Sequence, residues 1–85
     1  MGLGPQPPAV TDVEIEYCVP CGFRERAVDV AGAILAACEG DLEGLWLETG
    51  DHGVFEVRVD GETVYDKEES AFDVDRIVRD VRAAV

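Results

Sequence analysis

The chain has 85 residues, and its 19 acidic and seven basic side chains give it a net charge of −12. Such a charge repels nucleic acids and anionic membranes, so we expect neither as a partner. The sequence has no run of about 18 apolar residues and no secretory signal, which predicts a soluble, cytoplasmic protein. Acid excess with Lys67 as the only lysine favours adaptation to a high-salt cytoplasm (halophilic), and an ordinary acidic protein is the alternative.

The length predicts a single domain, preceded by a short tail. Residues 1–10 hold three prolines and two glycines without periodicity, so we expect them to be disordered and residues 11–85 to fold. Apolar and acidic side chains then alternate from residue 13 to residue 17, which predicts a strand with one charged face. Pro20 and Gly22 are expected to end this strand in a turn.

A helical pattern follows from about residue 23 to residue 38. Its apolar stripe consists of Ala27, Ala31, Ile34, Leu35 and Cys38. Gly40 is expected to terminate this helix. The apolar run at residues 45–47, bounded by glycines, predicts a strand that is buried on at least one face.

Residues 55–59 alternate again and predict a third strand. Asp60-Gly61 is a strong signal for a two-residue hairpin, because a type I′ turn needs positive φ at both positions. Residues 63–65 are then the returning strand. Asp73 or Ser70 is expected to cap a last helix. That helix is predicted from a stripe of Val74, Ile77, Val78, Val81 and Val85.

The predicted order is therefore β-α-β-β-β-α, an α+β fold. A strand–helix–strand connection makes the first two strands parallel, whereas the hairpin is antiparallel. Strands with one charged face imply a sheet that is covered on a single side. We therefore expect a mixed four-stranded sheet with both helices on one face.

Cys18 and Cys21 stand at the predicted strand-to-helix junction, and their spacing brings the two sulfurs within disulfide reach. The free N–H groups and the dipole at a helix N-terminus stabilise a thiolate, which is the nucleophile of disulfide exchange. The motif predicts a redox-active centre in which Cys18 and Cys21 are catalytic, without a cofactor or metal. We expect the partners to be thiol- or disulfide-bearing proteins or small thiols.

We expect Cys18 to attack, because it would stand outside the helix as the more exposed thiol, with Cys21 resolving. Arg24, three residues after Cys21, is a candidate for stabilising a thiolate, and a solvated helix face is the alternative. Mild oxidation is expected to join Cys18 to Cys21 and to leave Cys38 reduced. Cys38 would lie about 24 Å along the helix at 1.5 Å per residue.

Other interpretations of the motif remain open at this point. The pair could be half of a zinc site, with Cys38 and His52 as the further candidates, although these lie at irregular spacing on different elements. The thiols could be inert, or the chain could be a non-catalytic module that docks partners through the sheet edge or the Cys loop. Cys38 is expected to be a small core residue, His52 to be exposed, and Trp46 and Phe55 to lie in the core or on a sheet face.

Three segments carry a resemblance to a known family. They are VEIEYCVPC at residues 13–21, GVFEVRVDG at residues 53–61 and VYDK at residues 64–67. In these the chain resembles the selenoprotein W-like group, also called the SelT/SelW/SelH or Rdx family, which implies a thioredoxin-like fold and a thiol oxidoreductase role. Selenium-containing relatives have selenocysteine, the better nucleophile, at the position of Cys21, so this chain is similar to a cysteine-only version. The resemblance therefore favours Cys21 as the attacking residue and leaves the order of attack open. Relatives tend to have Phe-Pro where this chain has Phe72-Asp73, which leaves partner docking at that loop open.

Overall fold

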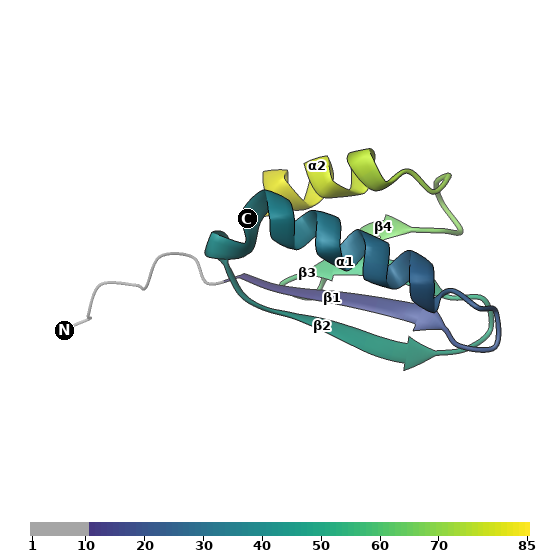
Figure 1. Cartoon of the computed structure of the whole chain (residues 1–85). Helices are drawn as coiled ribbons and strands as arrows, with labels where there is room; N and C mark the ends of the chain where they lie inside the picture. The colour runs from purple at the N-terminus through teal and green to yellow at the C-terminus, as the bar shows by residue number, and fades with distance from the viewer. Residues whose placement is uncertain (1–10) are drawn as a thin grey trace.

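Strands and helices follow one another in the order β-α-β-β-β-α in the computed structural model, which describes residues 11–85 (Figure 1). The tail predicted for residues 1–10 lies outside the described residues. The strands and helices are β1 Thr11–Cys18, α1 Arg24–Cys38, β2 Leu42–Gly50, β3 Phe55–Val59, β4 Glu62–Asp66 and α2 Val74–Ala84. A short 3₁₀ turn, Glu39–Asp41, joins α1 to β2. The predicted α+β fold is confirmed.

β1 is a central strand of the mixed sheet, whose strand order is β2-β1-β3-β4. It pairs in parallel with β2, from Thr11 opposite Leu42 to Cys18 opposite Gly50. On its other side it pairs antiparallel with β3, and β3 pairs antiparallel with β4. The crossover through α1 therefore places the end of β1, with its cysteine, beside the end of β2.

Both helices cover the same face of the sheet, and α1 and α2 contact each other (Figure 1). The core lies between this helical layer and the inward-facing side chains of the strands. Fully buried members of that core are Val13, Ile15, Ala27, Val30, Ile34, Phe55, Val57, Ile77 and Val81. Burying each larger aliphatic side chain contributes about 1.5–3 kcal/mol, so this layer supplies most of the hydrophobic stabilisation.

The structure corrects the predicted helix 23–38 in two details. Leu35 is exposed rather than buried, and Val30 is part of the buried stripe instead. Gly40 does not adopt the left-handed conformation of a terminating glycine, since the chain continues from α1 into the 3₁₀ turn that contains it. Neither helix in residues 11–85 is long and apolar enough to cross a membrane.

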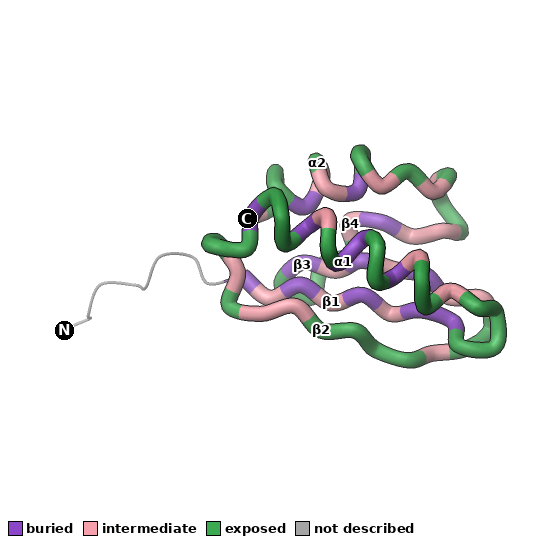
Figure 2. The backbone as a smooth tube through the Cα atoms, viewed as in Figure 1, coloured by how far each residue is buried: buried purple, intermediate pink, exposed green. Residues whose placement is uncertain are grey.

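The predicted burial of residues 45–47 is wrong for most of that run. Leu45 is half-buried, whereas Trp46 and Leu47 are exposed, and Figure 2 shows most of β2 in the exposed colour. The reason is position, because β2 is an edge strand from which only Leu42 and Leu45 pack against the core. Trp46 pairs with Glu14 and so lies on the sheet face opposite the helices, where its ring stands over Gly44.

The hairpin and the second helix form as predicted. Asp60 and Gly61 both have positive φ, 52° and 85°, as a type I′ turn requires. At the start of α2 the Asp73 carboxylate accepts a hydrogen bond from the Arg76 amide at 3.2 Å, so Asp73 is the cap and Ser70 is not. Asp73 thus caps α2 directly after Phe72.

Candidate redox site

Cys18 and Cys21 are joined by a disulfide at the junction of β1 and α1, with a Cα–Cα distance of 5.3 Å. Cys18 is the last residue of β1, and Cys21 lies in the turn that precedes the helix. Cys38 is the free thiol among the described residues, and it is buried. The expected pairing of the three cysteines therefore agrees with the structure.

The backbone around Cys18 is held firmly by two neighbouring segments. The Cys18 amide donates a hydrogen bond to the Val54 carbonyl at 2.8 Å, and the Val19 amide donates to the Gly50 carbonyl at 3.0 Å. The chain then reverses in a turn in which the Gly22 amide donates to the Val19 carbonyl at 3.0 Å. Gly22 has a φ of 76°, a conformation that glycine adopts without steric cost.

The two sulfur-bearing residues differ sharply in exposure. Cys18 is only 1% exposed, whereas Cys21 lies in the exposed turn. The premise that Cys18 is the more accessible thiol is therefore wrong. Cys18 is the last residue of a central strand, and sequence periodicity could not show that its amide would bond to Val54 in the loop before β3.

The helix begins within one residue of its predicted start, and Cys21 lies in the turn before it. α1 starts at Arg24, and Phe23 at the N-cap provides no side-chain hydrogen bond to the first turn. The first N–H groups of a helix lack intrahelical partners and carry partial positive charge. Cys21 therefore stands just ahead of an uncapped helix N-terminus, a location that favours the thiolate form.

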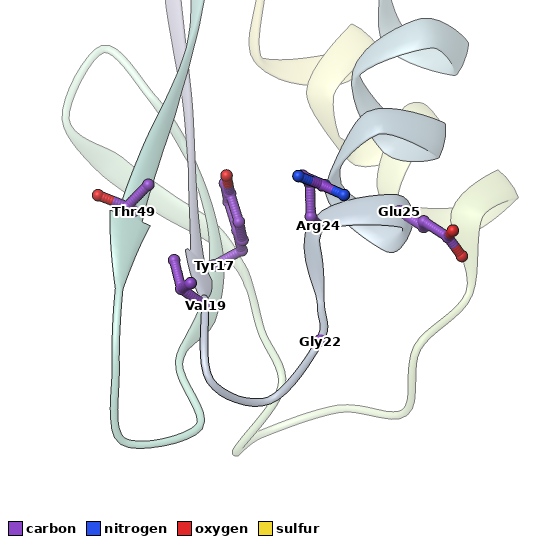
Figure 3. A pocket seen from close by; sticks show the side chains of 6 residues that line it. All are labelled: Tyr17, Val19, Gly22, Arg24, Glu25 and Thr49. Atoms are coloured by element: carbon purple, nitrogen blue, oxygen red, sulfur yellow. The ribbon is translucent and has the colours of Figure 1, made fainter.

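Arg24, the predicted thiolate-stabilising residue, projects into a hollow of about 690 Å³ between the end of the sheet and α1 (Figure 3). Tyr17, Val19 and Thr49 line this hollow with it, and Cys21 does not. Arg24 and Glu25 point to opposite sides of the first turn (Figure 3). The role of Arg24 stays a prediction, because the spacing rule behind it assumed that Cys21 was helical.

Arg26 lines a second hollow together with Cys21. This hollow has a volume of about 410 Å³. The Arg26 guanidinium carbon lies 4.9 Å from the centre of the Phe23 ring and 4.5 Å from the centre of the Phe72 ring. Phe72 comes from the loop before α2, 46 positions after Arg26, so no local sequence signal could have connected the two.

Aromatic side chains fix that loop against the site. Phe55 makes edge-to-face contacts with Phe23 and Phe72, with ring centres 6.1 and 5.7 Å apart. Tyr65 packs against Phe55 and Phe72, and its hydroxyl donates to the Ser70 carbonyl at 3.1 Å. Burial raises the pKa of Tyr65, and the nearby Arg26 charge acts in the opposite direction. The Phe72 loop is therefore a fixed wall of the Cys21 hollow.

The remaining candidates do not assemble into a metal site. Cys38 lies at the far end of α1, where its sulfur donates to the Ile34 carbonyl at 3.4 Å. His52 lies in the turn between β2 and β3 and contacts Asp51 at 2.6 Å. Across residues 11–85 no group of three or more His, Cys, Asp or Glu side chains could hold a metal ion. The expected core role of Cys38 and exposure of His52 agree with this geometry.

Comparisons with known proteins extend the resemblance over nearly the whole domain. A sequence model of the Rdx family matches residues 12–83. Proteins named migration and invasion enhancer 1 from Mus musculus and Bos taurus are each 32% identical over 60 residues, which is 68% of this chain and 49% of theirs. The chain spans about half the length of these curated relatives.

Two solved structures are similar in fold. A protein from Bordetella parapertussis superimposes with a TM-score of 0.84 at 25% identity, covering 91% of this chain and 100% of that one. A selenoprotein W-related protein from Vibrio cholerae gives a TM-score of 0.81 at 20% identity, covering 89% and 98%. These matches confirm the thioredoxin-like architecture.

Proposed function

Because the chain belongs to the Rdx family, we propose that it is a thiol–disulfide oxidoreductase that exchanges disulfides with protein or small-thiol partners. The observation that carries the proposal is the Cys18–Cys21 disulfide, whose second cysteine is exposed ahead of the N-terminus of α1. In the reduced protein the Cys21 thiolate attacks a partner disulfide and forms a mixed disulfide, releasing one partner thiolate. Cys18 then attacks the Cys21 sulfur, closes the internal disulfide and releases the second partner thiolate.

Two features support Cys21 as the attacking residue. Because Cys21 is exposed, the sulfur of a partner disulfide can reach it. Cys18 is buried, so its sulfur can react only with the adjacent Cys21. The location ahead of an uncapped first turn also favours a thiolate at Cys21. The proposal therefore reverses the order of attack that we expected from the sequence.

Two variants, each lacking one cysteine of the pair, test this mechanism. Reduced Cys18→Ser protein, which retains Cys21, should react with iodoacetamide at neutral pH at least about tenfold faster than reduced Cys21→Ser protein, which retains Cys18. Cys38 is present in both variants and serves as the internal control in peptide mapping. Both variants should lose the ability to reduce a model disulfide catalytically. Full activity in either one would exclude the paired-thiol mechanism.

A cytoplasmic setting follows from the same proposal, because a reducing compartment would return the internal disulfide to the dithiol form after each turnover. Trapping thiols in intact cells with an alkylating reagent measures the redox state directly. The proposal expects most Cys18–Cys21 pairs to be reduced in unstressed cells. A pair that is permanently oxidised would instead indicate a structural disulfide.

A second candidate function, a module that docks protein partners through the sheet edge, is favoured by one surface feature. The large exposed hydrophobic side chains of the described residues lie on β2, in the turn after β1 and on α1, with Trp46 on the sheet face opposite the helices. They are Val19, Val28, Leu35, Trp46 and Leu47. The edge of β2 also presents unpaired backbone groups, which can bind an extended peptide.

Substitution at this edge separates the two functions. Leu47→Lys places a charge on the exposed strand without touching the cysteines, so it should abolish partner capture if docking is the function. The same variant should retain reduction of a small model disulfide. Loss of small-disulfide reduction together with capture would argue against an independent docking role.

A further inference from the structure

The Arg26 side chain is held in place beside Cys21 by stacking rather than by hydrogen bonds. Its guanidinium lies between the Phe23 and Phe72 rings, within the range of cation–π attraction to both. Within residues 11–85 its side chain makes no ion pair or hydrogen bond. An arginine has five N–H donors, so this group is positioned while its donors remain available. Such a guanidinium is suited to bidentate binding of a carboxylate.

The hollow also contains negative charge. Glu25 and Asp29 line it together with Cys21 and Arg26. Neither carboxylate pairs with a basic side chain in the described part of the chain. Two free carboxylates repel a ligand that is purely anionic, and Arg26 repels one that is purely cationic. A ligand that carries both charges close together satisfies both groups.

We propose that the Cys21 hollow is a binding site for a small thiol or disulfide that carries a free α-amino acid group. The ligand carboxylate binds Arg26, and its ammonium group lies against Glu25 and Asp29. This arrangement leaves the ligand sulfur beside Cys21. The inference rests on the proposed function and deepens it, because an ordinary cysteine inside a protein chain has no free α-carboxylate and α-ammonium.

The reaction with cystine, the simplest disulfide of this class, balances as follows. The Cys21 thiolate attacks one cystine sulfur, the cystine S–S bond breaks, and one cysteine thiolate leaves. Cys18 then attacks the Cys21 sulfur of the mixed disulfide and releases the second cysteine. Two electrons pass from the protein dithiol to cystine, and the protein ends with the Cys18–Cys21 disulfide.

A matched series of disulfides tests the site. The probes are cystine, N,N′-diacetylcystine, which lacks the ammonium groups, and cystine dimethyl ester, which lacks the carboxylates. The rate of protein thiol loss with each probe is divided by that probe's rate with 2-mercaptoethanol, which removes differences in intrinsic reactivity. The normalised rate with cystine should exceed that with each derivative by about tenfold, the factor expected for one lost charge-assisted interaction.

Variants then assign the preference to residues. Arg26→Gln should lower the normalised cystine rate to that of the dimethyl ester, and Arg26→Lys should restore it in part. Glu25→Gln with Asp29→Asn should remove the advantage of cystine over diacetylcystine. Arg79→Gln, an equal charge change on the exposed side of α2, should leave the preference unchanged. Circular dichroism checks that each variant is folded.

The outcomes separate the inference from the function on which it rests. Equal normalised rates for the three probes would overturn the binding site and leave the oxidoreductase proposal standing. An equal slowing of all three by Arg26→Gln would also overturn it, since Arg26 would then act on the Cys21 thiolate. No reaction with any probe would overturn both proposals.

Discussion

At the scale of single residues, position in the fold determines what each cysteine can do. Cys18 is buried at the end of a central strand, Cys21 lies in an exposed turn, and Cys38 lies in the core at the other end of α1. The sequence motif predicted the redox pair because its spacing is local. It could not predict which sulfur is accessible, since the exposure of each cysteine depends on how the strands and loops assemble.

Cys38 is expected to be unreactive in the folded protein. Burial raises the pKa of its thiol, Asp41 adds to the effect, and Arg82 acts in the opposite direction. In the oxidised protein Cys38 should therefore react with iodoacetamide at neutral pH at least about a hundredfold more slowly than in urea. The pKa of the Cys38 thiol is higher in the folded than in the unfolded protein. The free energy of unfolding should therefore fall as the pH rises above about 8.5, where the unfolded thiol begins to ionise. Rapid labelling of Cys38 without urea would contradict its core role.

At the scale of strands and helices, Arg58 connects three strands on the open face of the sheet. Its guanidinium contacts Glu48 of β2 at 2.7 Å and Glu56 of β3 at 3.0 Å, and it also contacts two glutamates of β1 at 3.3 Å. The alternation of apolar and charged residues along β1 and β3 predicted that Arg58 and these glutamates lie on charged faces of their strands. It did not predict that one cation would bind four carboxylates, because that depends on the order of the strands.

Removing this cation should be costly. Burial alone lowers the pKa of Arg58, but the hydrogen bonds that it donates to Glu14 and Glu16 more than offset this, and the net pKa is raised. The Arg58 guanidinium therefore keeps its stabilising charge at every ordinary pH. Arg58→Met should reduce the free energy of unfolding by about 1–3 kcal/mol. This loss should be smaller at high salt, because salt screens the ion pairs. Arg79→Met is the control of equal charge, and an equal loss in both would refute a special role for Arg58.

The cap of α2 offers a second prediction at this scale. The Asp73 carboxylate bonds to the Arg76 amide, so Asp73→Ala should lower the free energy of unfolding by about 1 kcal/mol. The helix carries Ile77 and Val81 into the core, and a loosened first turn should also disturb the Phe72 loop. Urea titration measures the stability, and Ser70→Ala, which removes no cap, provides the control. A loss from Ser70→Ala as large as that from Asp73→Ala would contradict this assignment.

At the scale of the whole molecule, charge predicts the response to salt. With a net charge of −12, self-repulsion should weaken as counter-ions screen the surface, whereas the partly buried Arg58 cluster is screened less. The melting temperature should therefore rise from low to molar KCl. A variant with Glu43→Gln and Glu62→Gln, both at exposed positions, should show a flatter dependence. A melting temperature that stays constant or falls would argue against adaptation to high salt.

The overall architecture was predictable because each periodic segment is long enough to be recognised and the connection lengths allow few topologies. The exposure of Trp46 and Leu47 was not, since an apolar run has the same pattern in a central strand and in an edge strand. The pairing of Arg26 with Phe72 was hidden for a related reason. It depends on how the loop before α2 folds back over α1, which is a property of the assembled molecule.

The short distance in sequence between the two bonded cysteines has a consequence for the reduced state. The disulfide closes a loop with a sequence separation of only three residues, so it removes little conformational entropy from the unfolded chain, about 2 kcal/mol in the chain-entropy model. Cys18 stays anchored in β1 by its bond to Val54, so reduction should free the 19–23 turn alone. Hydrogen exchange should then quicken in that turn and not in β1. The protein would thus stay folded through its redox cycle, and only the 19–23 turn would be ordered in the oxidised form and mobile in the reduced form.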